Sequence, residues 1–277
     1  GAAGVDSARR PHGRTMSLRD TWIQAARGRG AGVSGALLVA ALTPLEWLFR
    51  AGFGVYMGAE RLGLRKRRRA SARVVSVGNL TLGGTGKTPV VESLARALSR
   101  NRRVCVLLRG YGGRKSQEGL LVSDGRATLC AWEDCGDEAA LLAASLPGVV
   151  VLAGKDRCVN AERAVRDYGA EVILLDDGLQ YWQLHRDADI VLVDARCPFG
   201  NGRVMPAGML REPLAGLRRA SAVILTHANE VSREALQVLG QRMARLAPRA
   251  RVHTAQYAPV ELAEPGGTLV PAEELRR

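Results

Sequence analysis

The sequence predicts an α/β fold built on a doubly wound, mostly parallel sheet, and two observations support this prediction. First, short and almost continuous apolar runs recur after residue 73, as expected for strands buried on both faces of a parallel sheet. These runs are VVSVGN (74–79), VCVLL (104–108), VVVLAG (149–154), VILLDD (172–177), IVLVDA (190–195) and AVILT (222–226). Second, helical length and composition are found in the stretches 89–100, 138–146, 157–168 and 232–246. Strands that alternate with helices in this way are typical of doubly wound folds.

Length and composition limit the classes of protein to consider. With 277 residues, of which 47% are apolar, the chain can bury one or two cores, which excludes a disordered or collagen-like protein. Its five cysteines form no CxxC pair and are odd in number. We therefore expect free thiols in a reducing compartment rather than a zinc or disulfide scaffold.

The net charge of +13 is concentrated at one end of the chain. Residues 1–73 carry +10 of it, so the remainder is nearly balanced. A nucleic-acid-binding surface spread over the fold is therefore not expected, and we predict no nucleic-acid partner. We expect residues 1–30 to be a disordered basic extension.

Residues 31–72 have the composition of a membrane-associating helical segment. Residues 31–45 carry no charge, and a second uncharged stretch, 51–59, follows Glu46 and Arg50, which can pair on one helix face. Four aromatic residues between 47 and 56 precede the basic run Arg65–Arg69, an order typical of a segment at the cytoplasmic face of a membrane. The apolar run is shorter than the roughly 20 residues that span a bilayer. A buried core helix followed by a solvated basic turn is therefore the alternative.

A glycine-rich motif, Thr81-Leu-Gly-Gly-Thr-Gly-Lys-Thr88, directly follows the first predicted strand and opens the first predicted helix. It matches the phosphate-binding P-loop except that Thr81 replaces the first glycine. Its backbone N–H groups and the helix N-terminus suit a phosphate, although a glycine-rich turn without a ligand is the alternative. We expect Lys87 to reach the β- and γ-phosphates of ATP and the Thr88 hydroxyl to ligate Mg²⁺. The predicted nucleotide-binding residues are Thr81, Leu82, Gly83, Gly84, Thr85, Gly86, Lys87 and Thr88.

Two acidic positions at strand ends compete for the metal in this P-loop NTPase-like fold. One is the doublet Asp176-Asp177, and the other is Asp194. The doublet is favoured because one carboxylate can hold a metal-bound water while the other orients its neighbours. Asp194 stays open as a further metal-site residue or as a plain strand-end carboxylate.

Three further segments suit an anionic acceptor with a reacting alcohol. Gly136-Asp137-Glu138 offers acids that can remove a proton, although an acid at a helix start can also be a simple cap. The stretch 109–114, RGYGGR, is a glycine-rich basic loop. The glycine- and proline-rich stretch 199–213 suggests a substrate-facing lid.

Together these segments resemble the tetraacyldisaccharide 4′-kinase family of the lipid A pathway. The resemblance rests on SVGNLTLGGTGKTPVV, RGYGGR, GDEAALLA, KDR, ILLDDGLQ, RDADIVLVDA and FGNGRVMPAGMLREP, which occur in the family's order. It implies a phosphotransferase that moves the γ-phosphate of ATP to the 4′-hydroxyl of tetraacyldisaccharide 1-phosphate and gives lipid IVA. It also implies work at the cytoplasmic face of the inner membrane, on an acylated disaccharide lipid in the cytoplasmic leaflet.

The resemblance also implies a role for individual residues. Asp137 corresponds to the general base, with Glu138 as a supporting carboxylate, and Lys87 and Arg157 correspond to positions at the reacting phosphates. The implied substrate-binding residues are Arg109, Tyr111 and Arg211. The implied metal-side residues are Thr88, Asp176, Asp177 and Glu212.

The chain departs from the family pattern at a few points. Tyr181 stands where histidine commonly follows DDGxQ, and Met209 stands where proline commonly precedes LREP. Family chains continue well beyond a point like Arg277, through a section with a functional histidine and a TxKD-type segment. We therefore expect the kinase domain, 73–277, to be truncated at its C-terminus. If it is truncated, we expect this 277-residue form to be inactive.

Two other functions remain as alternatives. The chief one is a membrane-associated P-loop ATPase switch without a small-molecule acceptor. Such ATPases typically carry a second lysine directly before GGxGKT, where this chain has Leu82. The other is a nucleotide-dependent adaptor or a nucleic-acid-stimulated ATPase, suggested by the basic run 65–69.

Overall fold

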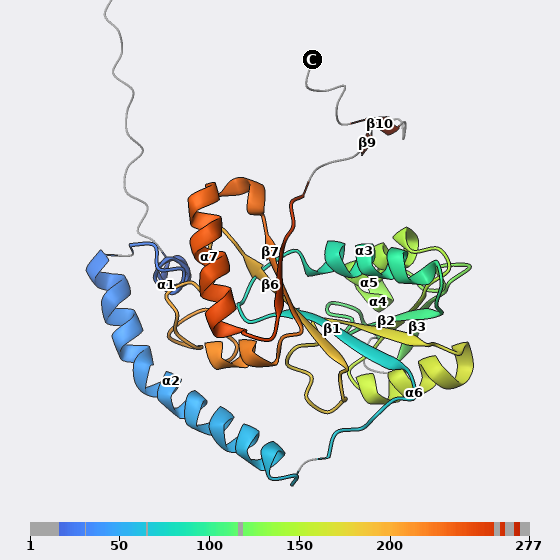
Figure 1. Cartoon of the computed structure of the whole chain (residues 1–277), viewed down its shortest axis with the longest axis horizontal. Helices are drawn as coiled ribbons and strands as arrows, with labels where there is room; N and C mark the ends of the chain where they lie inside the picture. Colours follow the sequence, from blue (N-terminus) through green and yellow to red (C-terminus); the bar gives the residue numbers. More distant parts are fainter. Residues whose placement is uncertain are drawn as a thin grey trace, which may run out of the picture.

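An eight-stranded sheet forms the centre of the computed structural model, which describes residues 17–30, 32–64, 66–115, 119–257, 261–263 and 269–271 (Figure 1). Across the sheet the strands follow the order β3 (Leu120–Asp124), β4 (Val150–Ala153), β2 (Val104–Leu108), β5 (Val172–Asp176), β1 (Arg73–Asn79), β6 (Ala188–Asp194), β7 (Ala222–Thr226) and β8 (Arg251–Thr254). Neighbouring strands are parallel except for the edge pair β3 and β4. The predicted doubly wound α/β fold is confirmed.

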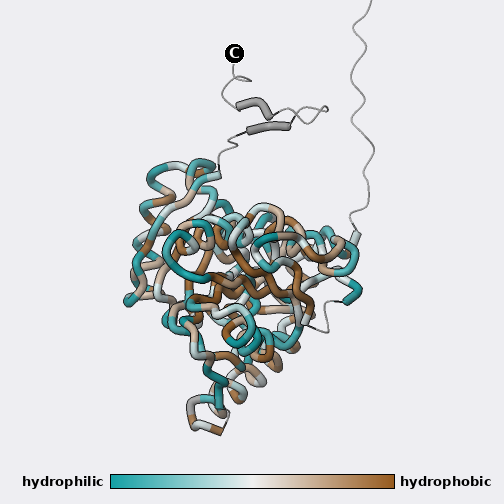
Figure 2. The backbone as a smooth tube through the Cα atoms, turned by 90° about the vertical axis from the view of Figure 1, so that its right-hand side faces the viewer, coloured by the Kyte–Doolittle hydropathy of each residue, from teal (hydrophilic) through white to brown (hydrophobic). Residues whose placement is uncertain are grey.

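Helices cover both faces of the sheet because its strands carry apolar side chains on both. In β2, Val106 packs with α3 (Lys87–Ser99) and α5 (Asp137–Ser145), whereas Leu107 packs with α6 (Arg157–Tyr168) on the opposite face. Further along that second face, α7 (Arg233–Leu246) and the 3₁₀ helix η2 (Leu214–Arg219) cover β6 and β7. Figure 2 shows the apolar strands enclosed at the centre of the domain. Alternate side chains of each strand therefore belong to different cores.

Several elements were not among the predicted ones. The edge strands β3 and β8 are short, and β8 is largely exposed, so neither has the apolar run of a central strand. The other unpredicted elements are α4 (Trp132–Cys135), η3 (Ala228–Glu230), and β9 (Glu261–Ala263) and β10 (Leu269–Pro271), which pair as a separate antiparallel hairpin.

The N-terminal region corrects one prediction. Within the expected disordered extension 1–30, Leu18–Ala26 form helix α1, which is capped by Ser17 as its hydroxyl accepts the Asp20 N–H. Residues 1–16 lie outside the described residues. The helix α2 (Gly32–Arg61) then forms one continuous helix of 30 residues that includes Pro44.

Helix α2 runs along the outside of the domain instead of inside a core (Figure 1). Among the described residues it is the one helix long and apolar enough to cross a membrane, and its most apolar window is only 11% buried. Its exposed large apolar side chains are Val33, Leu37, Leu45, Trp47, Leu48, Phe49 and Val55. The alternative of a buried core helix is therefore wrong.

The carboxyl ends of β1, β5 and β6 meet at the middle of one sheet edge, where the parallel strands place their following loops. Val77 of β1 pairs with Asp176 of β5, so the first acid of the doublet lies beside the exit of β1. Asp177 then has a φ of 49°, a left-handed conformation that turns the chain sharply away from the sheet. In a parallel sheet a ligand binds in such a crevice, beyond the carboxyl ends of the strands.

Candidate nucleotide and acceptor site

The segment 81–88 connects β1 to α3 and has the geometry of a phosphate-binding loop. Gly86, the residue before α3, has a φ of +77°, and a Cβ there would lie 1.7 Å from the Tyr257 hydroxyl, so only glycine fits. No described atom lies within 4 Å of where a Cβ on Gly83 or Gly84 would be. The backbone of these two glycines is therefore open to a ligand at the start of a helix.

Lys87 begins α3 and points toward the ends of β1 and β5. Its Nζ lies 3.4 Å from Asn79 Oδ1 and 3.7 Å from Asp177 Oδ1. Asn79 is fully buried at the end of β1 and also donates from Nδ2 to the Thr81 carbonyl at 2.9 Å. Asn79 was not among the predicted site residues, and its place directly before the loop was the only sequence signal for it.

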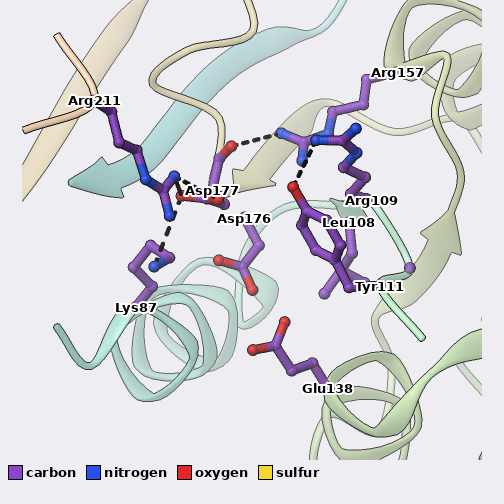
Figure 3. A pocket seen from close by; sticks show the side chains of 10 residues that line it. Lys87, Leu108, Arg109, Tyr111, Glu138, Arg157, Asp176, Asp177 and Arg211 are labelled. Atoms are coloured by element: carbon purple, nitrogen blue, oxygen red, sulfur yellow. Dashed lines mark hydrogen bonds and ion pairs between the residues drawn. The ribbon is translucent and has the colours of Figure 1, made fainter. Parts of the chain in front are cut away.

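Lys87 lines a cleft, called here the inner cleft, that lies between α3, α5 and the strand ends (Figure 3). Its lining residues are Lys87, Leu108, Arg109, Gly110, Tyr111, Glu138, Arg157, Asp176, Asp177 and Arg211. The structure thus brings together eight of the predicted catalytic, substrate and metal residues. Thr88 lies in the first turn of α3 beside them but does not line this cleft.

Asp176 and Glu138 point toward each other across the inner cleft (Figure 3). Burial, followed by the negative charge of Glu138, raises the pKa of Asp176 to about 6. Within the described residues Asp176 Oδ1 has no hydrogen-bond partner, although it is buried. A buried carboxylate with an unpartnered oxygen beside a phosphate loop fits a divalent cation.

The residues around Asp176 fit a cation held partly by phosphate. In the described part of the chain, no three His, Cys, Asp or Glu side chains gather closely enough to hold a metal ion. Mg²⁺ commonly needs only one or two carboxylates because waters and substrate phosphates complete its shell. Asp176 satisfies this requirement.

Asp177 has a different environment from its neighbour. Both of its oxygens accept from Arg211 Nη1, at 2.9 and 2.8 Å. Burial alone raises the pKa of Asp177, but Lys87 and Arg211 outweigh it and hold this pKa below its ordinary value. Asp177 therefore stays ionised and holds the side chains of Lys87 and Arg211 at the cleft. Asp176, in contrast, keeps one oxygen without a hydrogen-bond partner among the described residues.

Arginine and tyrosine side chains form the opposite wall. Arg157 is 3% exposed, donates from Nη1 to the Asp177 carbonyl at 3.0 Å, and lies over the Tyr181 ring. Arg109 donates to the Tyr111 hydroxyl at 2.5 Å. Tyr111 itself is exposed, so its ring is available at the rim of the cleft.

Asp137 lies at the N-terminus of α5 and is exposed, next to the loop that carries Tyr111. The preceding Gly136 has a φ of +88°, and a Cβ there would meet the Tyr111 carbonyl at 2.3 Å. Asp137 Oδ1 faces Gly112, 4.0 Å from where a Cβ on that glycine would be. The close packing that needs Gly136 thus places Asp137 beside the 110–113 loop, while Glu138 points into the inner cleft.

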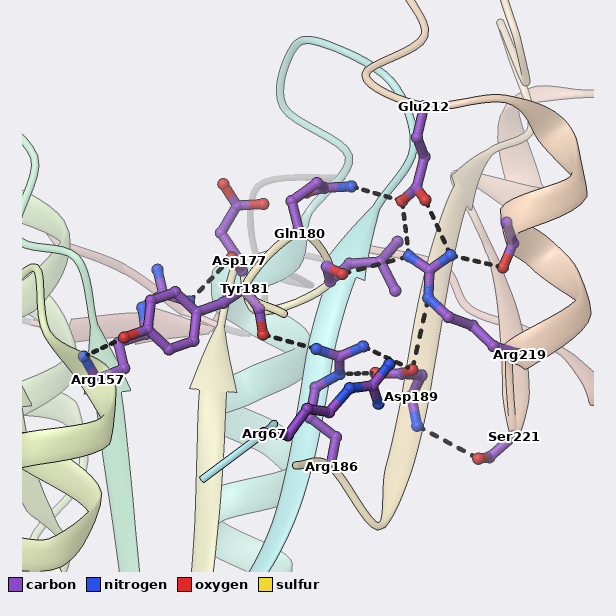
Figure 4. Close-up of polar contacts among 12 residues, drawn as sticks. Arg67, Arg157, Asp177, Gln180, Tyr181, Arg186, Asp189, Glu212, Arg219 and Ser221 are labelled. Atoms are coloured by element: carbon purple, nitrogen blue, oxygen red, sulfur yellow. Dashed lines mark hydrogen bonds and ion pairs between the residues drawn. The ribbon is translucent and has the colours of Figure 1, made fainter. Parts of the chain in front are cut away.

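Glu212, which was predicted to be a metal ligand, does not line the inner cleft. It is fully buried, and Arg219 donates to both of its oxygens, at 2.6 and 2.9 Å (Figure 4). Gln180 Nε2 donates to Glu212 Oε1 at 3.0 Å. Gln180 in turn accepts from Arg211, so Glu212 supports the residue that pairs with Asp177.

Asp194, the competing acid, is not near Asp176. It ends β6, where Arg196 donates to it at 2.8 Å, and it lines a separate hollow on the other side of the phosphate loop. An ion-paired carboxylate at this place suits a structural role or contact with another part of a nucleotide more than a metal.

A second cleft, called here the outer cleft, adjoins the inner one and shares five of its residues. Its lining residues are Leu82, Arg109, Tyr111, Lys155, Arg157, Asp177, Gln180, Tyr181, Gln183, Met205 and Arg211. Four of these carry positive charge and one carries negative charge. The outer cleft therefore suits an anionic ligand next to the inner cleft.

A family model described as tetraacyldisaccharide-1-P 4′-kinase matches residues 38–269. The chain belongs to this family. Curated family members support the assignment: the tetraacyldisaccharide 4′-kinase of Halothermothrix orenii is 45% identical over 204 residues, which is 73% of this chain and 53% of that protein. That of an Anaeromyxobacter species (strain Fw109-5) is 43% identical over 243 residues, 87% of this chain and 64% of that protein.

A solved structure agrees with this membership of the kinase family. The "apo" form of LpxK from Aquifex aeolicus, crystallised in complex with ATP, is 33% identical with a TM-score of 0.69. The match covers 86% of this chain and 71% of that one. The chain spans between about half and two thirds of the length of the curated relatives named above.

Proposed function

We propose that the protein containing this chain is a kinase that transfers the γ-phosphate of ATP to the 4′-hydroxyl of tetraacyldisaccharide 1-phosphate and forms lipid IVA. One observation carries the proposal: the phosphate loop and the unpartnered Asp176 open directly into a second cleft with an excess of positive charge. An ATPase without an acceptor needs only the first of these clefts. Family membership points to the same chemistry.

The inner cleft suits the triphosphate. The open backbone of Gly83 and Gly84 and the N-terminus of α3 would hold the phosphates, with Lys87 beside them. Arg157 and Arg211 are fixed by Asp177 and would face the charge that develops on the transferred group. Positive groups already held in place need little reorganisation during the reaction.

Asp176 and the Thr88 hydroxyl would hold Mg²⁺, and Glu138 would support it through its charge. When bound, Mg²⁺ neutralises charge on the β- and γ-phosphates. Asp177 is paired with Arg211 and would orient that arginine instead of binding Mg²⁺.

Asp137 is the group we assign to proton removal from the acceptor hydroxyl. It is exposed beside the loop that carries Tyr111, whereas Glu138 faces Asp176. A base must reach the hydroxyl of a bound acceptor, and a carboxylate in contact with the metal side would be less able to do so. Tyr111 and Arg109 would contact the sugar.

The outer cleft would hold the disaccharide and its 1-phosphate, and α2 would bring the protein to the acyl chains at the cytoplasmic face of the inner membrane. The arginines and the lysine of the outer cleft match the phosphate charge. The exposed apolar side chains of α2 match a lipid environment.

The test is an assay with γ-labelled ATP, Mg²⁺ and vesicles that contain tetraacyldisaccharide 1-phosphate, made on the complete gene product. We expect the label on the acylated disaccharide. Release of free phosphate at the same rate with and without the acceptor, and no labelled lipid, would instead support the ATPase switch. Vesicles of the same phospholipid without the disaccharide are the control.

A further inference from the structure

A buried carboxylate lies in the middle of the mostly apolar helix α2. The side chain of Glu46 is only 3% exposed and faces the domain. Its Oε2 accepts from Arg203 Nε at 2.7 Å, and its Oε1 accepts from the Val204 backbone N–H at 3.2 Å. One turn earlier, Thr43 Oγ1 accepts from Arg203 Nη2 at 2.9 Å. A buried carboxylate without partners is costly, so these contacts fix where α2 meets the domain.

Apart from Arg50, which pairs with it on the same helix at 3.7 Å, Glu46 contacts residues of the 199–212 connection, a part of the loop between β6 and η2. Helix α1 holds the same connection: Trp22 Nε1 donates to the Pro206 carbonyl at 2.7 Å, and the Asn201 N–H donates to the Ala26 carbonyl at 2.8 Å. The connection is thus pinned to both N-terminal helices, instead of lying free as the predicted lid would.

The other side of the 199–212 connection holds the phosphate loop. The Leu82 N–H donates to the Met209 carbonyl at 2.8 Å, and the Arg211 N–H donates to the Leu80 carbonyl at 2.7 Å. Leu210 forms an isolated β-bridge with Thr81, the first residue of the loop. These backbone contacts fix the position of the phosphate loop relative to the 199–212 connection.

Within the connection, the α2 side and the phosphate-loop side are directly bonded to each other. Val204 forms a bridge with Leu210, and the Leu210 N–H donates to the Arg203 carbonyl at 3.1 Å. The next residue, Met205, lines the outer cleft, and Arg211 lines both clefts. A shift of Arg203 and Val204 therefore reaches both clefts through hydrogen bonds.

We propose that Glu46 is a positioning residue: it holds the 199–212 connection against α2 and so sets the place of the phosphate loop and of Arg211. This inference rests on the proposed kinase function and adds to it that the membrane-facing helix takes part in forming the site. Phosphoryl transfer depends on placement, and an error of about 1 Å can cost roughly a hundredfold in rate.

The test compares three variants of the complete gene product in vesicles. Glu46→Ala removes both acceptor oxygens, and Glu46→Gln keeps one of them. Glu60→Gln is the matched control, because Glu60 is on the same helix but pairs with Arg67, which lies outside the 199–212 connection. At a temperature where circular dichroism shows all of them folded, we expect kcat to fall at least tenfold in Glu46→Ala. Glu46→Gln should lie between it and the wild type, and Glu60→Gln should match the wild type.

A second measurement separates this inference from the kinase function. Hydrogen exchange of the amides of Leu82 and Arg211, which donate across the connection, should become faster in Glu46→Ala and stay unchanged in Glu60→Gln. If the wild type labels no acylated disaccharide, the proposed function fails, and exchange at these two amides still decides the inference. If Glu46→Ala lowers the melting temperature but keeps the wild-type kcat and the wild-type exchange rate at both amides, the positioning role of Glu46 is wrong. If Glu46→Ala does not fold, Glu46→Gln carries the same comparison.

Discussion

The carboxylates of Asp176 and Glu138 face each other in the inner cleft, and their environment disfavours the ionised form of Asp176. Burial is the larger cause and the charge of Glu138 is the next, and together they raise the pKa of Asp176 to about 6. This relationship links the metal site, the pH dependence and the stability of the fold.

Metal-dependent activity should decline in mild acid. Protonated Asp176 cannot hold Mg²⁺, so at limiting Mg²⁺ we expect kcat/KM for ATP to fall about tenfold per pH unit below pH 6. Glu138→Gln removes one cause of the raised pKa, and the midpoint should therefore move to lower pH. The surface variant Glu92→Gln, whose side chain pairs with Arg96 on α3, is the control and should leave the midpoint in place.

Asp176→Asn should stabilise the folded protein in the absence of metal. The pKa of Asp176 is about 6 in the folded state against an ordinary value of 3.8, so the native state binds the proton more tightly. Stability is therefore lost as pH rises between about 4 and 6, and above pH 6 the cost is about 3 kcal/mol. Urea unfolding at pH 8 should show a gain of that order for Asp176→Asn, and about half of it at pH 5. An equal loss at both pH values would contradict the assignment.

Lys87→Ala should abolish most of the phosphoryl transfer. Lys87 is part of the phosphate loop, and its ammonium group is held by Asn79 and Asp177. Loss of such a group commonly costs about 10²–10³ in kcat. Lys115→Ala is the matched control because Lys115 pairs with Asp134 at the surface. Steady-state kinetics of both variants, with binding of a fluorescent ATP analogue, would check the prediction.

Asp137→Asn should lower kcat by about 10²–10⁴ while the affinity for ATP stays the same, because a base acts in the chemical step. Asp134→Asn, an acid of the neighbouring α4, is the control. A variant that keeps its kcat and its pH profile would exclude Asp137 as the base. Its place in the first turn of α5 would then reflect only the favourable charge of an acid at a helix N-terminus.

The central fold could be predicted from the sequence because the apolar runs of β1, β2 and β5 are long enough to be unambiguous. The polar strand β8 and the helix α1 could not, because their stability comes from tertiary contacts. The sequence of α1 is short and mixes polar with apolar residues, and its contact from Trp22 to the 199–212 connection spans 184 positions.

The phosphate loop and the acidic doublet were also visible in the sequence, but the separate environments of the two aspartates were not. Which of them keeps a free oxygen depends on Arg211, which approaches from a loop 34 positions later. The sequence also could not show that Arg219 donates hydrogen bonds to both oxygens of Glu212, because this contact too depends on the folded loop.

Glu212→Gln distinguishes a supporting role from a metal-binding one. The buried Glu212 accepts from Arg219 at both oxygens, so the substitution leaves Arg219 with a weaker partner, since Asp189 remains only at 3.6 Å. Breaking a buried pair costs about 3 kcal/mol, and urea unfolding should show a loss of that order. Because Glu212 does not line the inner cleft, the Mg²⁺ concentration that gives half-maximal kcat should stay the same. A large rise in that concentration with little change in stability would restore Glu212 as a metal ligand.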